Sequence, residues 1–550
     1  MSALGQSVPR KEAPNKVNGT VKYNYDFTSN DLLYCWLVTS LYGHAKIRAV
    51  DCSAALQSPG VQAVITGKDY PTLVGVMLDD RPPLAVDRAR YFGEPIAVVV
   101  ANSLFEARKA ADLVIVDYEP LPVVNSPGDA VKPEAPLLHP NLEQYNKVEP
   151  EIYPEPGSNI AHRQRIRKGD LQRGWAESEV IIETTVKLPQ SDHAAMETRS
   201  ARAQIRADGS VVIHTPSQAP FMVKTMISRY FQIDVGKVVV HTPLVGGAYG
   251  GKTTVQLELI AYLASKAVNG RMVMVANSRE QDMSSSAVQM GLEARIKLGA
   301  AKSGKIKAAE MTFLIDSGAY TDSAPIMTKA IAANCTGPYN IEHLWCDALC
   351  VYTNHPYATA FRGFGHTAYT FAIERALEKM AYALGMDPFT FREINVLVPG
   401  NTSPTQVPLN ASNLGDLPQC LQKLKKLINW QEGSRIESQG GLVRAKGLSC
   451  FWKTSSSPTD AISGAVLMLN ADGTINLICG ASECGQGTKT AVAQILAERM
   501  GMRPEQIHVV MEVDTRLSPE HWKTVASMST YMVGRAVLAA ADELIRQLRE

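Results

Sequence analysis

Short apolar runs separated by polar turns dominate the first part of the chain. Their length and β-branched content are typical of strands. A helix is predicted for 103–113, because Ser103 precedes its apolar face and Glu106 completes a capping box three residues later. Strands are predicted for 33–40, 63–66, 96–101 and 114–118. This alternation predicts a compact α/β domain over residues 1–124.

The remaining chain divides into two further domains joined by linkers. Residues 125–159 are rich in Pro and Gly and show little periodicity, so we interpret them as a linker that crosses a surface. Residues 160–395 open with alternating strands and continue as strand–loop–helix units. A second linker is predicted for 396–442, and a third domain for 443–550. Strands of these domains are predicted for 180–188, 203–206, 211–215, 465–469 and 475–479.

The chain ends inside a predicted helix that begins near Gly534. Before that helix, the third domain offers two or three strands, which leaves a sheet with open edges and exposed apolar surface. We therefore expect this domain to be completed by a further segment or by another chain.

A glycine loop between a strand and a helix is the most informative feature. A β-branched strand is predicted for 237–245, the loop is Gly246 to Gly251, and apolar residues recur at helical spacing from Thr253 to Ala267. Glycines let a ligand approach the backbone closely, and the start of a helix offers free N–H groups to an anion. The residues alone predict either a ligand-binding loop or a glycine turn needed for tight packing.

Gly246 to Thr253 also satisfy the phosphate-loop pattern G-x-x-x-x-G-K-T, which makes a nucleotide triphosphatase an alternative. Two observations count against it. The loop lies far into the chain, and the neighbouring strand 271–276 runs into Asn277 instead of an Asp that would hold magnesium. Asp316, at the end of another apolar run, is the best substitute.

Two more glycine loops precede predicted helices. Ala360-Phe-Arg-Gly-Phe-Gly365 follows a strand at 347–352 and precedes a helix with one apolar face. Gly480 to Gly487 precedes a helix that contains Leu496. Taken singly, an exposed arginine or a tight turn explains either loop. Taken together, the three loops predict a cradle for a large anionic cofactor, whereas a nucleotide triphosphatase needs only the first.

Composition narrows the function classes further. Hydrophobic residues make up 45% and charged residues 20% with a net charge of +1, which is typical of a soluble globular protein and offers no basic surface for nucleic acid. No secretory signal is visible, and no apolar stretch approaches the ~18 residues of a membrane helix. The nine cysteines are scattered, so we expect a cytoplasmic protein without disulfides or an iron–sulfur cluster of its own.

The motifs and their order resemble the xanthine dehydrogenase/aldehyde oxidase family of molybdenum hydroxylases, specifically its molybdopterin-binding large subunit. Val245 to Lys252 resembles the family's GGGFGGK loop, and Ala360 to Gly365 its AFRGFG motif. Gly485 to Thr488, with Gln494, resembles its glutamine-containing pterin loop. Tyr91 to Pro95 and Asp117 to Pro122 are similar to the family's hammerhead domain. The resemblance implies a multidomain α/β and α+β fold that begins with a hammerhead-like domain.

The resemblance also implies roles for individual residues. Arg362 and Phe364 would lie beside the metal and the substrate, and Gln190, three residues before His193, would approach an apical oxygen. Molybdenum would be held by the pterin dithiolene and by no side chain. The cofactor would be bound by Gly246, Gly247, Ala248, Tyr249 (through its N–H), Gly250, Gly363, Gln486, Gly487, Ala526, Ser527, Ser529 and Thr530.

Several positions depart from the pattern of xanthine-using members. Lys329 aligns with their substrate-orienting Arg, and Thr253 stands in place of a carboxylate, which argues against xanthine itself. Gly363 stands where carbon monoxide dehydrogenases carry a copper-binding Cys, which argues against that activity. The family's general base is a late Glu that would lie beyond residue 550, and Glu94 belongs instead to the hammerhead pattern.

The implied function is hydroxylation of an N-heterocycle (purine-like) or aldehyde with oxygen from water. The implied cofactor is molybdopterin or its cytosine dinucleotide form. Because the sequence offers no flavin-binding fold and no clustered cysteines, a 2Fe–2S cluster and FAD are expected on separate partner subunits. Two alternatives remain, which are a phosphate-loop nucleotide triphosphatase and a non-catalytic cofactor-binding relative.

Overall fold

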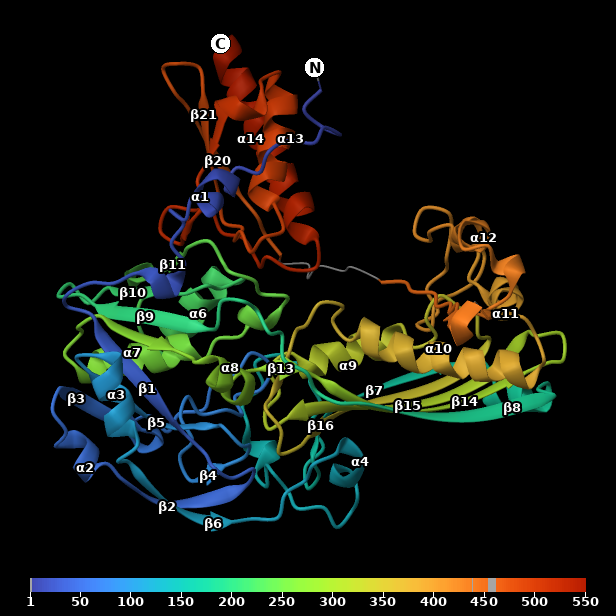
Figure 1. The fold of residues 1–550 in the computed structure, drawn as a ribbon, viewed down its shortest axis with the longest axis horizontal. Coiled ribbons are helices and arrows are strands. Elements are labelled where there is room, and N and C mark those ends of the chain that lie inside the picture. The colour runs from blue at the N-terminus through green and yellow to red at the C-terminus, as the bar shows by residue number, and fades with distance from the viewer. Residues whose placement is uncertain (1, 438, 454–460) are drawn as a thin grey trace.

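The computed structural model describes residues 2–437, 439–453 and 461–550. Two large sheets lie next to each other, and a smaller third domain sits above them with both chain termini (Figure 1). The first sheet has eight strands in the order β23-β11-β10-β9-β12-β1-β5-β3. Their bounds are β1 Leu33–Thr39, β3 Val61–Thr66, β5 Pro95–Ala101, β9 Ser200–Ile205, β10 Val211–His214, β11 Val238–Thr242, β12 Val273–Ala276 and β23 Val513–Asp514.

The N-terminal strands share this sheet with strands from the second region. β1 pairs in parallel with β12, in a register that places Leu33 opposite Val273. Every residue of β5 is buried, so β5 needs cover on both faces. A three-stranded antiparallel sheet and a helix complete the N-terminal region, with Ser103 capping the helix as expected. These elements are β2 Ala45–Asp51, β4 Arg88–Ala89, β6 Ile115–Pro120 and α3 Leu104–Ala111.

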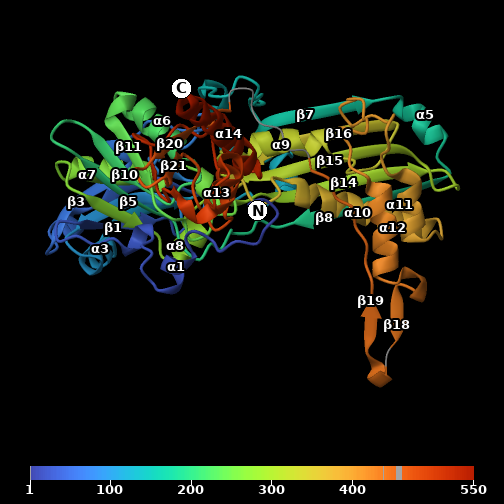
Figure 2. The same ribbon diagram turned by 90° about the horizontal axis from the view of Figure 1, so that it is seen from above.

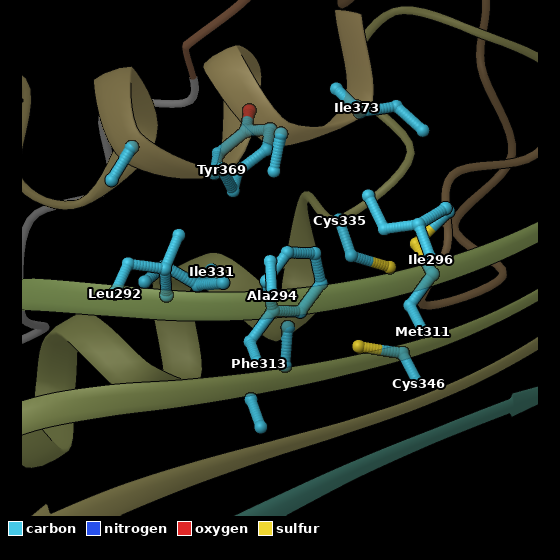
Figure 3. Packing of buried hydrophobic residues seen from close by; sticks show 14 of the residues in the cluster. Leu292, Ala294, Ile296, Met311, Phe313, Ile331, Cys335, Cys346, Tyr369 and Ile373 are labelled. Carbon is cyan, nitrogen blue, oxygen red and sulfur yellow. The ribbon is translucent and has the colours of Figure 1, made fainter. Parts of the chain in front are cut away.

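The second sheet has five strands in the order β7-β16-β15-β14-β8 and extends away from the first (Figure 2). Two helices, α9 and α10, cover one of its faces. The elements are β7 Ile160–Lys168, β8 Val180–Leu188, β14 Gly291–Ala300, β15 Ile306–Gly318, β16 His343–Tyr352, α9 Ala324–Ala333 and α10 His366–Ala383. The largest apolar core of the described residues fills the space between sheet and helices, with Phe313, Leu292 and Tyr369 inside it (Figure 3).

The two segments expected to be linkers contain structure of their own. Residues 125–159 include a short helix, α4 (Pro127–Ala130), and bury Leu138, Leu142 and Ile152 in the core of the second sheet. Periodicity could not indicate this packing, because the buried side chains are isolated anchors on irregular backbone. Residues 396–442 include α12 (Leu417–Leu427) and the first strand of a protruding hairpin, β18 (Arg435–Glu437) and β19 (Val443–Ala445) (Figure 2).

The third domain packs two helices against a three-stranded sheet. The strands β20 (Ala465–Leu469) and β21 (Ile475–Cys479) have the predicted bounds, and β22 (Ile507–Val509) pairs with β21. The helices are α13 (Thr488–Met500) and α14 (Met528–Arg549). The last helix begins before Gly534, directly after two residues with positive φ, Ala526 and Ser527. Among the described helices, none has the length and apolar character needed to cross a membrane.

Replacing Phe313 by Ala should destabilise the second sheet, because its side chain is fully buried on β15. We expect a loss of about 3–5 kcal/mol. Hydrogen exchange of backbone amides in β14–β16 measures this domain separately from the others. The matched control is Phe371→Ala in α10, since Phe371 is 48% exposed and should cost less than about 1 kcal/mol. Equal losses at the two positions would contradict this account of the core.

Candidate cofactor-binding site

The three glycine loops meet at the junction of the first sheet, the second sheet and the third domain. At Gly250 φ is +107°, and a Cβ there would lie 2.6 Å from the carbonyl oxygen of Ala360, so the first two loops touch. Val245 donates its N–H to the carbonyl oxygen of Glu483 at 2.9 Å, which joins the first loop to the third. Loops distant in the sequence thus form one continuous surface.

Gln218 connects the first loop to the segment before α14. Its side-chain oxygen accepts the N–H of Gly250 at 3.0 Å, and its side-chain nitrogen donates to the carbonyl oxygen of Thr524 at 2.9 Å. The backbone of Thr524 returns a bond to the Gln218 carbonyl at 2.8 Å. The Thr524 hydroxyl also accepts the N–H of Ser482 at 2.9 Å, near the third loop. Sequence reasoning missed Gln218, although a buried amide between a strand and a helix is a residue type that commonly bridges backbone groups.

The first loop does not lead directly into a helix, which corrects the helix predicted from Thr253. A short 3-10 turn covers Gly251–Thr253, the chain is then extended at Thr254, and α7 (Leu257–Ala267) begins only at Leu257. The carboxylate of Glu258 accepts the N–H of Gln256 at 3.0 Å, so part of the start of α7 is already occupied. The start of α7 is therefore separated from the first loop by residues 254–256.

Lys252 lies inside the protein instead of facing a nucleotide. Its ammonium is 2.9 Å from a carboxylate oxygen of Glu197, and the same oxygen accepts the N–H of Gly246 at 2.8 Å. Burial lowers the pKa of Lys252, and the charge of Glu197 opposes that shift. Two of the groups that a phosphate loop offers to a nucleotide are thus bound to a side chain of this protein. The geometry does not favour the nucleotide triphosphatase alternative.

The start of α13 is also occupied by a carboxylate. Glu483 accepts the N–H groups of Gly485, Gly487 and Lys489 at 3.0, 2.9 and 3.1 Å. Arg10, near the N-terminus, donates to the carbonyl oxygen of Gly485 at 2.8 Å. The expectation that this helix start offers free N–H groups to an anion is therefore wrong for these three residues.

Gln486 folds back on its own loop. Its side-chain oxygen accepts the N–H of Cys484 at 2.7 Å, and its side-chain nitrogen donates to the Ser482 carbonyl oxygen at 2.9 Å. In the segment that precedes and begins α14, Ser529 is buried, with its hydroxyl 3.4 Å from a ring nitrogen of His521. The neighbouring Ala526, Ser527 and Thr530 are exposed.

The centre of the first loop retains free donors. The N–H groups of Gly247, Ala248 and Tyr249 donate to no acceptor in the part of the chain that the structure describes. Gly247 and Tyr249 have φ values of +97° and +54°, so the backbone alternates in hand, as it does in anion-binding nests. Three adjacent free N–H groups on a bent backbone fit an oxygen-rich ligand such as molybdopterin with its metal.

The second loop presents two residues with different surroundings. Arg362 is exposed and has no ion pair or hydrogen bond among the described residues. Phe364 has a φ of +52° and packs partly against the main core. The loop ends at Gly365, where φ is +81° and a Cβ would lie 3.0 Å from the Ile331 side chain of α9, so both the backbone conformation and the close approach favour glycine.

The segment containing Gln190 and His193 supports the second loop. Gln190 donates to the carbonyl oxygen of Pro356 at 3.0 Å, and a His193 ring nitrogen is 2.8 Å from the carbonyl oxygen of Ala360. Burial lowers the pKa of His193 to about 4, so this ring is neutral at pH 7. Two polar side chains thus position the backbone on either side of β17 (Ala358–Thr359).

Two charged residues named in the sequence analysis, Lys329 and Glu94, have partners outside the three glycine loops. Lys329 forms an ion pair with Glu151 at 2.7 Å, on the segment 125–159. Glu94 accepts the Arg90 N–H at 2.5 Å and the hydroxyl of Tyr320, and burial raises its pKa. Glu94 therefore belongs to a buried interface. These contacts do not bring its carboxylate to the glycine loops, where a base would be needed.

The fold and the site define a class of protein with a hammerhead-type domain followed by cofactor-binding domains. Residues 18–122 match the family model "Aldehyde oxidase and xanthine dehydrogenase, a/b hammerhead domain". Residues 152–396 and 423–550 match two models described as molybdopterin cofactor-binding domains.

Individual relatives agree with these models. The chain is 31% identical to a probable xanthine dehydrogenase subunit of Bacillus subtilis strain 168, covering 98% of this chain and 70% of that protein. It is 29% identical to the putative xanthine dehydrogenase molybdenum-binding subunit of Escherichia coli K12, covering 97% and 70%. The solved aldehyde oxidoreductase from Desulfovibrio gigas superposes with a TM-score of 0.83 and 26% identity, covering 99% of this chain and 60% of that one.

The chain belongs to the xanthine dehydrogenase and aldehyde oxidase family, and its second and third regions are molybdopterin cofactor-binding domains. This confirms the family, the enzyme class of molybdenum hydroxylase and the multidomain α/β and α+β fold that the motifs predicted.

His355 should stabilise the region next to the second loop in a pH-dependent way. A hydrogen bond to the carboxylate of Asp316, at 2.7 Å, raises the pKa of His355 above its usual value. The stabilisation is complete below the unfolded pKa, about 6.5, and is lost as the pH rises through the folded pKa. We expect His355→Gln to lower the thermal unfolding midpoint most at pH 5.5 to 6. The difference from the unmodified protein should shrink at pH 8 to 9, and a difference independent of pH would contradict the charged pair.

Proposed function

We propose that this chain is the molybdopterin-binding part of an oxidoreductase that hydroxylates an N-heterocycle or an aldehyde with oxygen from water. The observation that carries the proposal is the row of free N–H groups at Gly247, Ala248 and Tyr249, at the point where three glycine loops meet. Membership of the family supports the same conclusion. The cofactor would be molybdopterin or its cytosine dinucleotide form, and it would supply the redox chemistry.

The residues of this chain would bind the cofactor and orient the substrate. The free N–H groups of the first loop, with Gly246 and Gly250 shaping the backbone, would face the cofactor at its metal end. Gly363, Gln486, Gly487, Ala526, Ser527, Ser529 and Thr530 would line the rest of the cofactor. Phe364 would stack on a flat substrate ring, and Gln190 would lie close to the metal.

Arg362 is the strongest candidate for contact with the reacting groups. Its guanidinium is exposed and has no partner in the described residues, so it is available to a ligand. Lys329 would orient an anionic or carbonyl-bearing substrate only after leaving Glu151, because the pair now occupies its ammonium. The presence of Lys and Thr where xanthine-using members carry Arg and a carboxylate supports a substrate other than xanthine.

Protein purified from its native source should contain molybdenum and give pterin fluorescence after oxidation. Arg362→Ala should retain both and the unfolding midpoint, because Arg362 is exposed and makes no ion pair or hydrogen bond among the described residues. It should lower turnover per molybdenum at least tenfold, since a charge beside the reaction is lost. The neighbouring exposed residue Thr367 provides a control, and Thr367→Ala should have little effect. Unchanged turnover per molybdenum in Arg362→Ala would remove Arg362 from the site.

We propose that electrons pass to a 2Fe–2S subunit and an FAD subunit in a cytoplasmic assembly, and that further polypeptide packs on the third domain. Its outer strand β20 exposes Val466, Met468 and Leu469 by 40%, 51% and 46%, an apolar edge suited to further polypeptide. The family relative named as a subunit supports a multisubunit arrangement.

The isolated chain should therefore bind a hydrophobic dye at β20. Val466→Thr with Met468→Gln should reduce dye binding without changing the fold, as checked by circular dichroism. Addition of the partner subunits should suppress dye binding, because they would cover this apolar surface. Equal dye binding by the double variant and the unmodified chain would contradict the assignment of β20 as the exposed apolar surface.

A further inference from the structure

The carboxylate of Glu197 is enclosed by donors from the N-terminal segment and from the first loop. One oxygen accepts the N–H of Asn24 at 3.2 Å, and the other binds the Gly246 N–H at 2.8 Å and the Lys252 ammonium at 2.9 Å. The side chains of Glu197 and Lys252 are 9% and 4% exposed. A Cβ at Gly246 would lie 2.5 Å from the Cβ of Glu197, so the absence of a side chain at 246 permits this approach.

This donor set is that of an anion-binding loop. Backbone N–H groups and a lysine ammonium after a glycine-rich turn are what a phosphate loop presents to its nucleotide. Here a side chain of the same chain fills the position, and the ion pair is buried, so removal of one partner leaves an uncompensated charge. The glycine-loop pattern is thus explained without a nucleotide.

Because Glu197 fills the anion position of the first loop, only some of the backbone N–H groups of that loop remain free. Gly246 and Gly250 are bound to Glu197 and Gln218, on either side of the three free N–H groups. Fixing both ends holds Gly247, Ala248 and Tyr249 in their bent conformation. Glu483 acts in the same way at the third loop, where it binds three backbone donors.

We propose that Glu197 is an internal anion that takes the place of a phosphate in the first loop and thereby positions the loop for the cofactor. The cofactor part of this inference rests on the proposed function, whereas the internal-anion part does not. Glu197 is a positioning residue, because its contacts are with Asn24, Gly246 and Lys252 and it acts on the cofactor through them. The chemistry it imitates is that of a small oxyanion.

Chemical rescue tests the internal anion directly. Glu197→Ala should lower the thermal unfolding midpoint, and sodium formate should restore part of the loss in a saturable way. Sodium chloride at the same ionic strength should not. The double variant Glu197→Ala with Lys252→Met should show no rescue, because it lacks the ammonium that binds the added anion. Equal responses to formate and chloride, or rescue that persists without Lys252, would overturn the proposal.

A second variant covers the case in which Glu197→Ala fails to fold. Glu197→Gln keeps the shape and a hydrogen-bond acceptor but removes the charge. It should lose pterin and molybdenum severalfold faster than the unmodified protein during dialysis, while the unmodified rate is unchanged by formate. Glu374→Gln is the matched control, since Glu374 is also buried and paired, with Arg392 at 2.8 Å, but lies within α10 away from the first loop. It should lower stability without faster cofactor loss.

The two measurements separate the inference from the proposed function. Absence of molybdopterin from the unmodified protein would refute the proposed function, and the formate experiment would still decide whether Glu197 is an internal anion. Retention of cofactor by Glu197→Gln as long as by the unmodified protein would overturn the positioning role.

Discussion

Backbone N–H groups need acceptors, and the choice of acceptor sets the shape of this site. A buried donor without a partner costs free energy, so folded proteins pair nearly all of them. In the first loop this chain pairs the outer donors with Glu197 and Gln218 and leaves the central ones free. In the third loop it pairs three donors with Glu483. This division between paired and free donors sets the first loop apart from a phosphate loop with the same glycine pattern.

The loops can only form one surface because the sheets place them together. The first sheet carries strands of the N-terminal region, the second region and, through β23, the third domain. The pairing of His241 with Asp514 joins the third domain to that sheet, and Gln218 with Thr524 joins it to the first loop. The site therefore depends on contacts between domains more than on any single helix start.

The sequence predicted local elements well where the pattern was strong. The strands 180–188, 465–469 and 475–479 have the predicted bounds, and Ser103 caps α3. It did not predict the shared sheet, because apolar strands such as β5 do not specify their neighbours. It misplaced the start of α7, because Val255 continues the helical spacing while the backbone at Thr254 is extended. Glu197 was overlooked, because its partners lie 49 and 55 positions away.

The pairing of β1 with β12 imposes an order of events during synthesis. Leu33 leaves the ribosome well before its partner Val273 is made. At roughly 5–20 residues per second, this interval is on the order of ten to fifty seconds. During that time β1 lacks its neighbour β12, although β5 and β3 are already available to pair on its other side, and contacts of such long sequence separation also form slowly. Nascent chains of this protein therefore present an unprotected strand edge at β1, the kind of edge that favours pairing with other chains.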